Sequence, residues 1–160
     1  MAYDAFLKLD DVNGEVQDSQ YANWIEIDSF SWGATQTGVS ASGGGGGAGK
    51  VSFQDLHITK PTDTSSAVLF QKCATGEHFQ KAHIEVRKAR DAAGEPSSVF
   101  LKFDLEDVLV SSFEFAGASG GSDRPAEEVS LNFAKVTFEY DAPDGEVDTF
   151  AWDVATNSIQ

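Results

Sequence analysis

Residues 98–115 read SVFLKFDLEDVLVSSFEF, a long run in which apolar and polar side chains alternate. The apolar side chains of its first half that share one face are Val99, Leu101, Phe103 and Leu105. Alternation with a period of two is typical of a half-buried β-strand, because successive side chains of a strand point to opposite faces. The run therefore predicts either two successive strands or one long bent strand.

The same alternation recurs on both sides of this run. It covers residues 3–9, 24–32, 82–88, 127–140 and 150–154. In the segment EEVSLNFAKVTFEY (127–140), the apolar side chains change parity between Phe133 and Val136, and we interpret this shift as a β-bulge. Many short strands joined by Gly/Ser-rich or acidic connections indicate a β-barrel or a β-sandwich.

One segment departs from this pattern. In TDTSSAVLFQKCATG (62–76), the apolar residues recur at spacings of three and four, which predicts one amphipathic helix over about 64–75. Asp63 or Thr64 is the expected N-cap and Gly76 the stop signal. We expect Cys73 on or beside the buried stripe, where it would act as a small hydrophobic residue.

Length and charge narrow the function classes. A chain of 160 residues is long enough for one domain (1–160) with its own core. Its formal net charge of −15 argues against nucleic acid as a partner, because proteins that bind it neutralise phosphates with Lys and Arg. The one cysteine excludes an internal disulfide, and we see neither a signal peptide nor an apolar run long enough for membrane insertion.

Residues 43–52 read GGGGGAGKVS and nearly match a phosphate-binding loop. That motif requires Ser or Thr directly after Lys50 and a helix behind it. Val51 follows instead, and the next residues alternate as in a strand, so we predict neither nucleotide binding nor any other cofactor. The long segment 33–49 contains no predicted element, and loops of this length are usually functional or disordered.

The other candidate catalytic and metal-binding motifs also lack the neighbouring residues or elements that they require. Ser119 lies in GASGG (117–121), but the following helix and a later histidine, which the nucleophile elbow needs, are both missing. His57, His78 and His83 do not have the spacing of zinc ligands, and no acidic stretch fits a calcium loop. We predict no catalytic residues, no metal site and no enzymatic activity.

Several segments carry a resemblance to a known family. They are AYDAFLKLDDVNGE (2–15), WIEIDSFSWG (24–33), GGGAGKVSFQDLHITKPTD (45–63), CATGEHF (73–79), RKA (87–89) and LVSSFEFAGASGGSDRPAEEVSLNFAKVTFEY (109–140). With these segments, in this order and spacing, the chain resembles the Hcp family (hemolysin-coregulated protein), the tube-forming subunit of the bacterial type VI secretion system. The resemblance is weaker near residues 89–98 and after residue 141.

The resemblance implies an antiparallel β-barrel of two sheets with one flanking helix. It also implies homohexameric rings that stack into an inner tube, surrounded by a contractile sheath and capped by a VgrG spike. The subunit would fold in the cytoplasm and leave through the type VI apparatus without a signal peptide, with effector proteins in the lumen of some relatives. The alternatives are a soluble effector-binding chaperone and a phage-tail-tube-like protein that does not act in type VI secretion.

Within this family the glycine run is best explained as an assembly loop, because glycine permits close backbone approach. The expected ring contacts are Gly43, Gly44, Gly45, Gly46, Gly47, Ala48, Gly49, Lys50, Gln54 and Asp55. Ser119 is the expected contact to the lumen or to an effector. The alternative for the loop is a disordered surface segment that makes no contacts.

Overall fold

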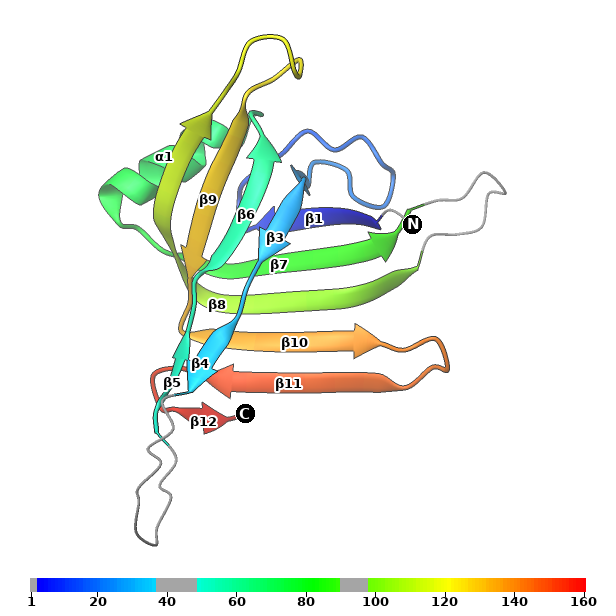
Figure 1. Ribbon diagram of the computed structural model, residues 1–160, viewed down its shortest axis with the longest axis vertical. Coiled ribbons are helices and arrows are strands. Elements are labelled where there is room, and N and C mark those ends of the chain that lie inside the picture. Colours follow the sequence, from blue (N-terminus) through cyan, green and yellow to red (C-terminus); the bar gives the residue numbers. More distant parts are fainter. Residues whose placement is uncertain (1–2, 37–48, 90–97) are drawn as a thin grey trace, which may run out of the picture.

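The computed structural model describes residues 3–36, 49–89 and 98–160 (Figure 1). In chain order, the elements are β1 (Tyr3–Leu9), β2 (Ile25–Ile27), β3 (Ser29–Ser31), β4 (Ala34–Gln36), β5 (Val51–Phe53), β6 (Leu56–Pro61), α1 (Ser66–Thr75), β7 (Phe79–Lys88), β8 (Val99–Ala116), β9 (Ala126–Asn132), β10 (Lys135–Asp141), β11 (Val147–Asp153) and β12 (Ser158–Ile159). All strand pairings are antiparallel, so the predicted mainly β class with one helix is confirmed.

Two sheets share the long strand β8 and close around one core. Sheet A has the order β12-β11-β10-β8-β7-β1-β2, and sheet B has the order β3-β6-β9-β8. Strands β10, β11 and β12 extend sheet A beyond the barrel, below it in Figure 1. Strands β4 and β5 form a separate two-stranded ribbon.

Strand β8 belongs to both sheets, and of the two alternatives for this run the long bent strand is correct. Its first half pairs with β7 and β10, and its second half, from Leu109 onward, pairs with β9. Between the halves Asp107 has φ 55°, a left-handed conformation that is uncommon outside glycine. The buried residues change parity there, from Phe103 and Leu105 to Val108 and Val110.

The parity shift in 127–140 is a change of sheet, and the predicted β-bulge is wrong. Strand β9 ends at Asn132 in sheet B, and β10 begins at Lys135 in sheet A. Phe133 and Ala134 form the corner between them. The register irregularities lie elsewhere, between Val86 and Arg87 and between Val110 and Ser112.

The alternating segment 24–32 also divides between the sheets. Strand β2 pairs with β1 in sheet A, whereas β3 pairs with β6 in sheet B. At the corner, the backbone N–H of Asp28 donates to the carbonyl of Thr59 at 2.8 Å. This corner and the bend in β8 close the barrel on its two sides.

Side chains from both sheets and from the helix fill the core. The members with the least exposure are Leu7, Leu9, Ile25, Leu56, Ile58, Leu69, Ala82, Ile84, Val86, Leu105, Val108, Val129, Leu131 and Val136. Because period-two alternation places every second residue of each strand in this core, removing these side chains from water is the main driving force for the fold.

Helix α1 begins at Ser66, two residues later than the predicted start, and its N-cap is Ser65. Gly76 ends it in the left-handed conformation, with φ 73°, as the stop signal indicated. Only Ser66 and Leu69 are buried on the helix. Phe70, one of the apolar residues at helical spacing, is 51% exposed, and its ring contacts those of Phe113 and Phe115 on β8.

The outer face of sheet A carries a second, smaller packed cluster that the alternation did not indicate. Phe6 is buried there beneath Tyr21, and the two rings stack with centroids 4.3 Å apart. The Arg87 guanidinium lies 5.0 Å from both ring centroids and pairs with Asp18 at 2.7 Å. The segment after β1 is held close to β2, since a Cβ on Gly14 would lie 2.3 Å from the Trp24 carbonyl oxygen.

Candidate assembly surfaces

Sheet B has an open edge on each side. Strand β3 pairs only with β6 among the described strands, so its outer edge has no strand partner there. At the other side, β7 pairs with β8 only as far as Val108, and none of the described strands pairs with that edge along Leu109–Ala116. Open strand edges present unpaired backbone donors and acceptors, which another chain can satisfy.

Exposed aromatic rings flank both open edges. Beside β8, Phe70 of α1 packs against Phe113 and Phe115, with centroids 5.3 and 5.9 Å apart. Phe115 remains 55% exposed. Beside β3, Tyr3 is 48% exposed and its ring lies 6.1 Å from that of Phe30. We call Phe70, Phe113 and Phe115 the aromatic corner; large exposed apolar groups of this kind mark interaction sites.

The β4–β5 ribbon leads into the glycine segment. The predicted loop 33–49 is shorter than expected, because Ala34–Gln36 form β4 and pair with β5. Gly43–Ala48 lie outside the described residues. Gly49 and Lys50 are described, and Lys50 is exposed without an ion pair to any described residue.

Gln54 and Asp55 lie at the root of the ribbon, where β5 ends and β6 begins. The Gln54 backbone N–H donates to the Gly33 carbonyl at 2.9 Å. The Asp55 carboxylate accepts hydrogen bonds from Ser111 Oγ at 2.6 Å and from Asn132 Nδ2 at 2.8 Å. These bonds tie the root of the ribbon to β8 and β9, so Asp55 fixes its position from within the same chain.

An open apolar groove of about 610 Å³ separates the ribbon from the extension of sheet A. Its aromatic lining includes Trp32, Phe53, Phe138, Phe150 and Trp152. Trp32 and Phe53 stack with centroids 5.8 Å apart. The indole N–H groups of both tryptophans are buried and have no acceptor among the described residues. The groove is a third surface that a second copy could cover.

Ser119 lies in the exposed loop between β8 and β9. It lines a groove of about 530 Å³ together with residues that include Asp28, Pro61 and Arg124. None of the described histidines hydrogen-bonds to Ser119. The described geometry therefore does not form the Ser–His pair that a nucleophile elbow requires.

The three histidines lie far apart and pair with different groups. Ser130 Oγ shares a hydrogen bond of 2.6 Å with His57, and Asp107 accepts one of 2.7 Å from His78. His83 lies between Asp104 and Glu85 on the outer face of sheet A. The hydrogen bond with Asp104 raises the pKa of His83 above its ordinary value, against the opposing effect of partial burial, and Glu85 adds to the rise.

No cluster of three or more His, Cys, Asp or Glu side chains in the described ranges could hold a metal ion. Within the same ranges, no helix has both the length and the apolar character needed to span a lipid bilayer.

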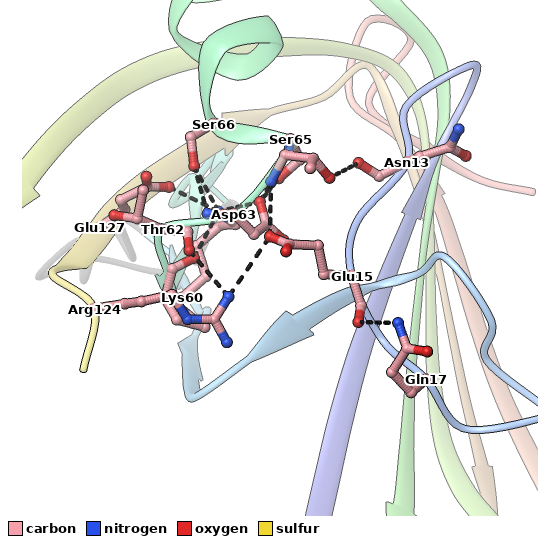
Figure 2. Close-up of polar contacts among 12 residues, drawn as sticks. Asn13, Glu15, Gln17, Lys60, Thr62, Asp63, Ser65, Ser66, Arg124 and Glu127 are labelled. Atoms are coloured by element: carbon pink, nitrogen blue, oxygen red, sulfur yellow. Dashed lines mark hydrogen bonds and ion pairs between the residues drawn. The ribbon is translucent and has the colours of Figure 1, made fainter. Parts of the chain in front are cut away.

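A buried charge network is the main feature that the sequence patterns did not reveal (Figure 2). Lys60 and Glu127 are both fully buried, and Lys60 Nζ lies 2.7 Å from Glu127 Oε2 and 3.0 Å from Asp63 Oδ1. The sequence did contain an indication of this network. Lys60 follows Leu56 and Ile58 on β6 at the same spacing of two, so it lies on the buried face of the strand. Glu127 does the same with Val129 and Leu131 on β9.

The protein is a helix-flanked antiparallel β-barrel with two open sheet edges, each beside exposed aromatic rings, and such edges can pair with a strand of another chain. Residues 6–140 match the family described as "Type VI secretion system effector, Hcp". The chain belongs to this family, which confirms the resemblance noted in its sequence.

Individual relatives are similar over the whole chain. The protein Hcp1 of Pseudomonas aeruginosa is 42% identical over 98% of both chains. The crystal structure of Hcp1 from Salmonella typhimurium superposes with a TM-score of 0.83 at 32% identity, covering 100% of both chains. A further solved structure, described as a type six secretion system protein, has a TM-score of 0.87 at 31% identity and covers 99% of this chain and 100% of its own.

Proposed function

We propose that this protein is a structural subunit of the type VI secretion inner tube, built from homohexameric rings that stack on one another. The observation that carries the proposal is the pair of open edges on sheet B. The β3 edge of one copy can pair with the β8 edge of the next, a head-to-tail contact between two different patches. Contacts of this kind close into rings when the rotation per subunit is suitable.

The ring would place sheet B around a central channel. Neighbours that touch through sheet B need room for sheet A and its extension, and space increases with distance from the axis. The barrel bodies therefore point outward, and the outer face of sheet B lines the lumen with polar side chains such as Ser31, His57 and Ser112. Ser119, in the loop beyond this face, would lie at the lumen rim, where an effector could contact it.

The net charge of −15 opposes assembly, because identical acidic subunits repel one another. The proposed contacts avoid most of this repulsion, since they consist of backbone edges and aromatic rings. On the outer face of sheet A, several acids already have cations within the chain, as in the pairs of Lys102 with Glu139 and Lys135 with Asp153. Salt would reduce the remaining repulsion over a Debye length of about 8 Å.

Stacking of rings is assigned to the assembly loop. The described ribbon of β4 and β5 leads into this segment, and Asp55 anchors the ribbon root to β8 and β9. The exposed Lys50 would meet a carboxylate of the neighbouring ring. By family membership, the VgrG spike, the contractile sheath and effector proteins are the proposed partners. The protein is then exported from the cytoplasm through the apparatus and acts as a structural component, without enzymatic activity.

Mass photometry and negative-stain electron microscopy of the purified chain test the ring, and complementation of a type VI-active strain lacking its own tube gene tests secretion. We expect hexameric rings, and we expect this protein in the culture supernatant only when the apparatus is intact. A strict monomer from micromolar to millimolar concentration would refute the tube proposal and favour the effector-binding chaperone. Rings that fail to support secretion would favour a phage-tail-tube-like role instead.

A further inference from the structure

Lys60 lies at the end of β6, fully buried, where strands β6 and β9 and the start of α1 meet. We propose that Lys60 is a positioning residue for assembly: through Glu127 and Asp63 it fixes α1, and α1 in turn fixes the aromatic corner beside the open edge of β8. The inference deepens the proposed function and rests on it, because the corner matters for assembly only if that edge pairs with a second copy.

The strand side of the network joins β6 to β9. Lys60 and Glu127 are directly opposite in the strand register, and their ion pair is 2.7 Å long with both side chains at 0% exposure. Lys60 Nζ also donates to the Pro61 carbonyl at 2.9 Å, just before the chain turns toward the helix. An ammonium group buried this completely needs paired charges and acceptors, and these contacts supply them.

The helix side of the network holds the first turn of α1. Lys60 Nζ lies 3.0 Å from Asp63 Oδ1 and 3.3 Å from Ser66 Oγ. Asp63 Oδ1 also accepts hydrogen bonds from the backbone N–H and the hydroxyl of Ser65. Ser65, the N-cap, makes no side-chain capping bond of its own. The start of the helix is therefore set by Asp63 and Lys60, since the usual capping bond is missing.

The outer surface of the network adds a second set of restraints around the same turn. Arg124, from the β8–β9 loop, donates to the Thr62 carbonyl at 3.2 Å and lies 3.5 Å from Glu15. Glu15 in turn accepts the Thr64 backbone N–H at 3.0 Å. Figure 2 shows these groups converging on the turn that precedes α1 from separate parts of the chain.

One turn further along its axis, the helix reaches the assembly edge. Phe70, one turn into α1, contacts Phe113 and Phe115, and these two residues lie on the half of β8 whose outer edge is open. A shift of the helix start would move Phe70 along that edge. A continuous set of contacts thus connects buried Lys60 with the surface that the neighbouring subunit would meet.

Stability alone does not account for this arrangement. A buried ion pair is often no more stabilising than well-packed apolar side chains of similar volume, although removal of one partner is strongly destabilising. Here Glu127 Oε1 is buried and has no donor among the described residues, so the network is not even fully satisfied. Such a network is better explained by the placement that it imposes on the helix.

The test separates placement from stability by replacing both partners. Purified K60M, K60M/E127L and wild type are compared by thermal unfolding, by hydrogen exchange of the 66–75 segment and by sedimentation velocity over a concentration series. K102M/E139L is the matched control, because it removes a Lys–Glu pair from the outer face of sheet A, away from α1. We expect K60M to melt about 10 °C or more below wild type.

For K60M/E127L we expect a melting temperature near that of wild type, faster exchange in α1, and an assembly midpoint raised about tenfold, in the range of measured couplings between linked sites. The control should assemble like wild type. Wild-type assembly or unchanged α1 exchange in K60M/E127L would overturn the proposal, as would equal weakening in the control. If the double variant does not fold, S66A replaces it, and unchanged assembly or unchanged exchange in that variant refutes the proposal.

Failure of the ring itself remains distinguishable. If wild type does not assemble at any concentration, the proposed function is wrong, and the exchange experiment alone decides whether Lys60 positions α1. Unchanged exchange in K60M/E127L would then reject the positioning role as well.

Discussion

Replacement of Phe115 by serine is the sharpest single test of the open β8 edge. Phe115 is 55% exposed in the isolated subunit, so its substitution removes little core packing. Fully buried aromatic side chains remove roughly 150–250 Å² from water, which leaves about 100 Å² of Phe115 for a neighbouring copy to cover. At about 25 cal/mol per Å², that burial contributes about 2.5 kcal/mol to each contact.

A loss of this size weakens each contact about seventy-fold. We therefore expect F115S to remain folded, with an unfolding temperature close to that of wild type, and to form rings only at much higher concentration. Sedimentation velocity over a concentration series measures the midpoint. I159S is the matched control, because Ile159 is 74% exposed but lies on β12, at the edge of sheet A.

Equal assembly of F115S and wild type would show that the aromatic corner is not part of the ring contact. Equal weakening by I159S would show that general surface hydrophobicity, and not the β8 edge, drives association. A folded F115S that stays monomeric while I159S forms rings would support head-to-tail pairing through sheet B.

Four further predictions concern other parts of the molecule. Because the pKa of His83 is raised in the folded state, its protonated form stabilises the fold below the ordinary histidine pKa, and this stability is lost as pH rises through the folded pKa. The unfolding temperature should therefore fall more between pH 5.5 and 8.5 in wild type than in H83Q. K50E should reduce ring stacking in electron micrographs while single rings persist, and saturable ATP binding by wild type would contradict our interpretation of the glycine run. G14A should destabilise the subunit by about 2 kcal/mol in urea unfolding, because its Cβ would lie 2.3 Å from the Trp24 carbonyl oxygen, and wild-type stability would contradict this expectation. Ring assembly should strengthen as salt rises, and dissociation of the rings in moderate salt would show that ion pairs hold them together.

Much of the local structure was predictable from period-two alternation and from stop signals. The alternation located most of the strands, although not β4 or β12, and Gly76 marked the end of the predicted helix, because a left-handed C-cap favours glycine. The start of that helix was less predictable. Asp63 and Thr64 resemble capping residues, but Asp63 instead contacts Lys60 and Ser65. Lys60 is held there by Glu127, which lies 67 positions further along the chain.

The candidate assembly surfaces were predictable only in part. The glycine run predicts an assembly loop, whose residues Gly43–Ala48 lie outside the described structure. Asp55 forms hydrogen bonds within the chain at the root of the ribbon, and its role as a ring contact stays a prediction. The aromatic corner was not foreseen, because helical spacing predicts an apolar stripe but not that the ring of Phe70 stays exposed beside β8. Its exposure depends on where α1 lies against β8, which helical spacing does not specify.

Most strand segments, the helix, the acidic character and the family could be predicted from the amino-acid sequence. The sheet that each strand joins, and the positions where the chain turns the corner between the sheets, depended on how the whole chain folds. Alternation reports which side of a strand is buried, but the hydrogen-bond partners of a strand are distant in sequence. A change of parity at Asp107 or Phe133 therefore looks the same whether a strand bulges, bends or crosses to another sheet. The open edges of sheet B and the pairing of Lys60 with Glu127 follow from that choice of partners, so they emerge only when the chain has folded.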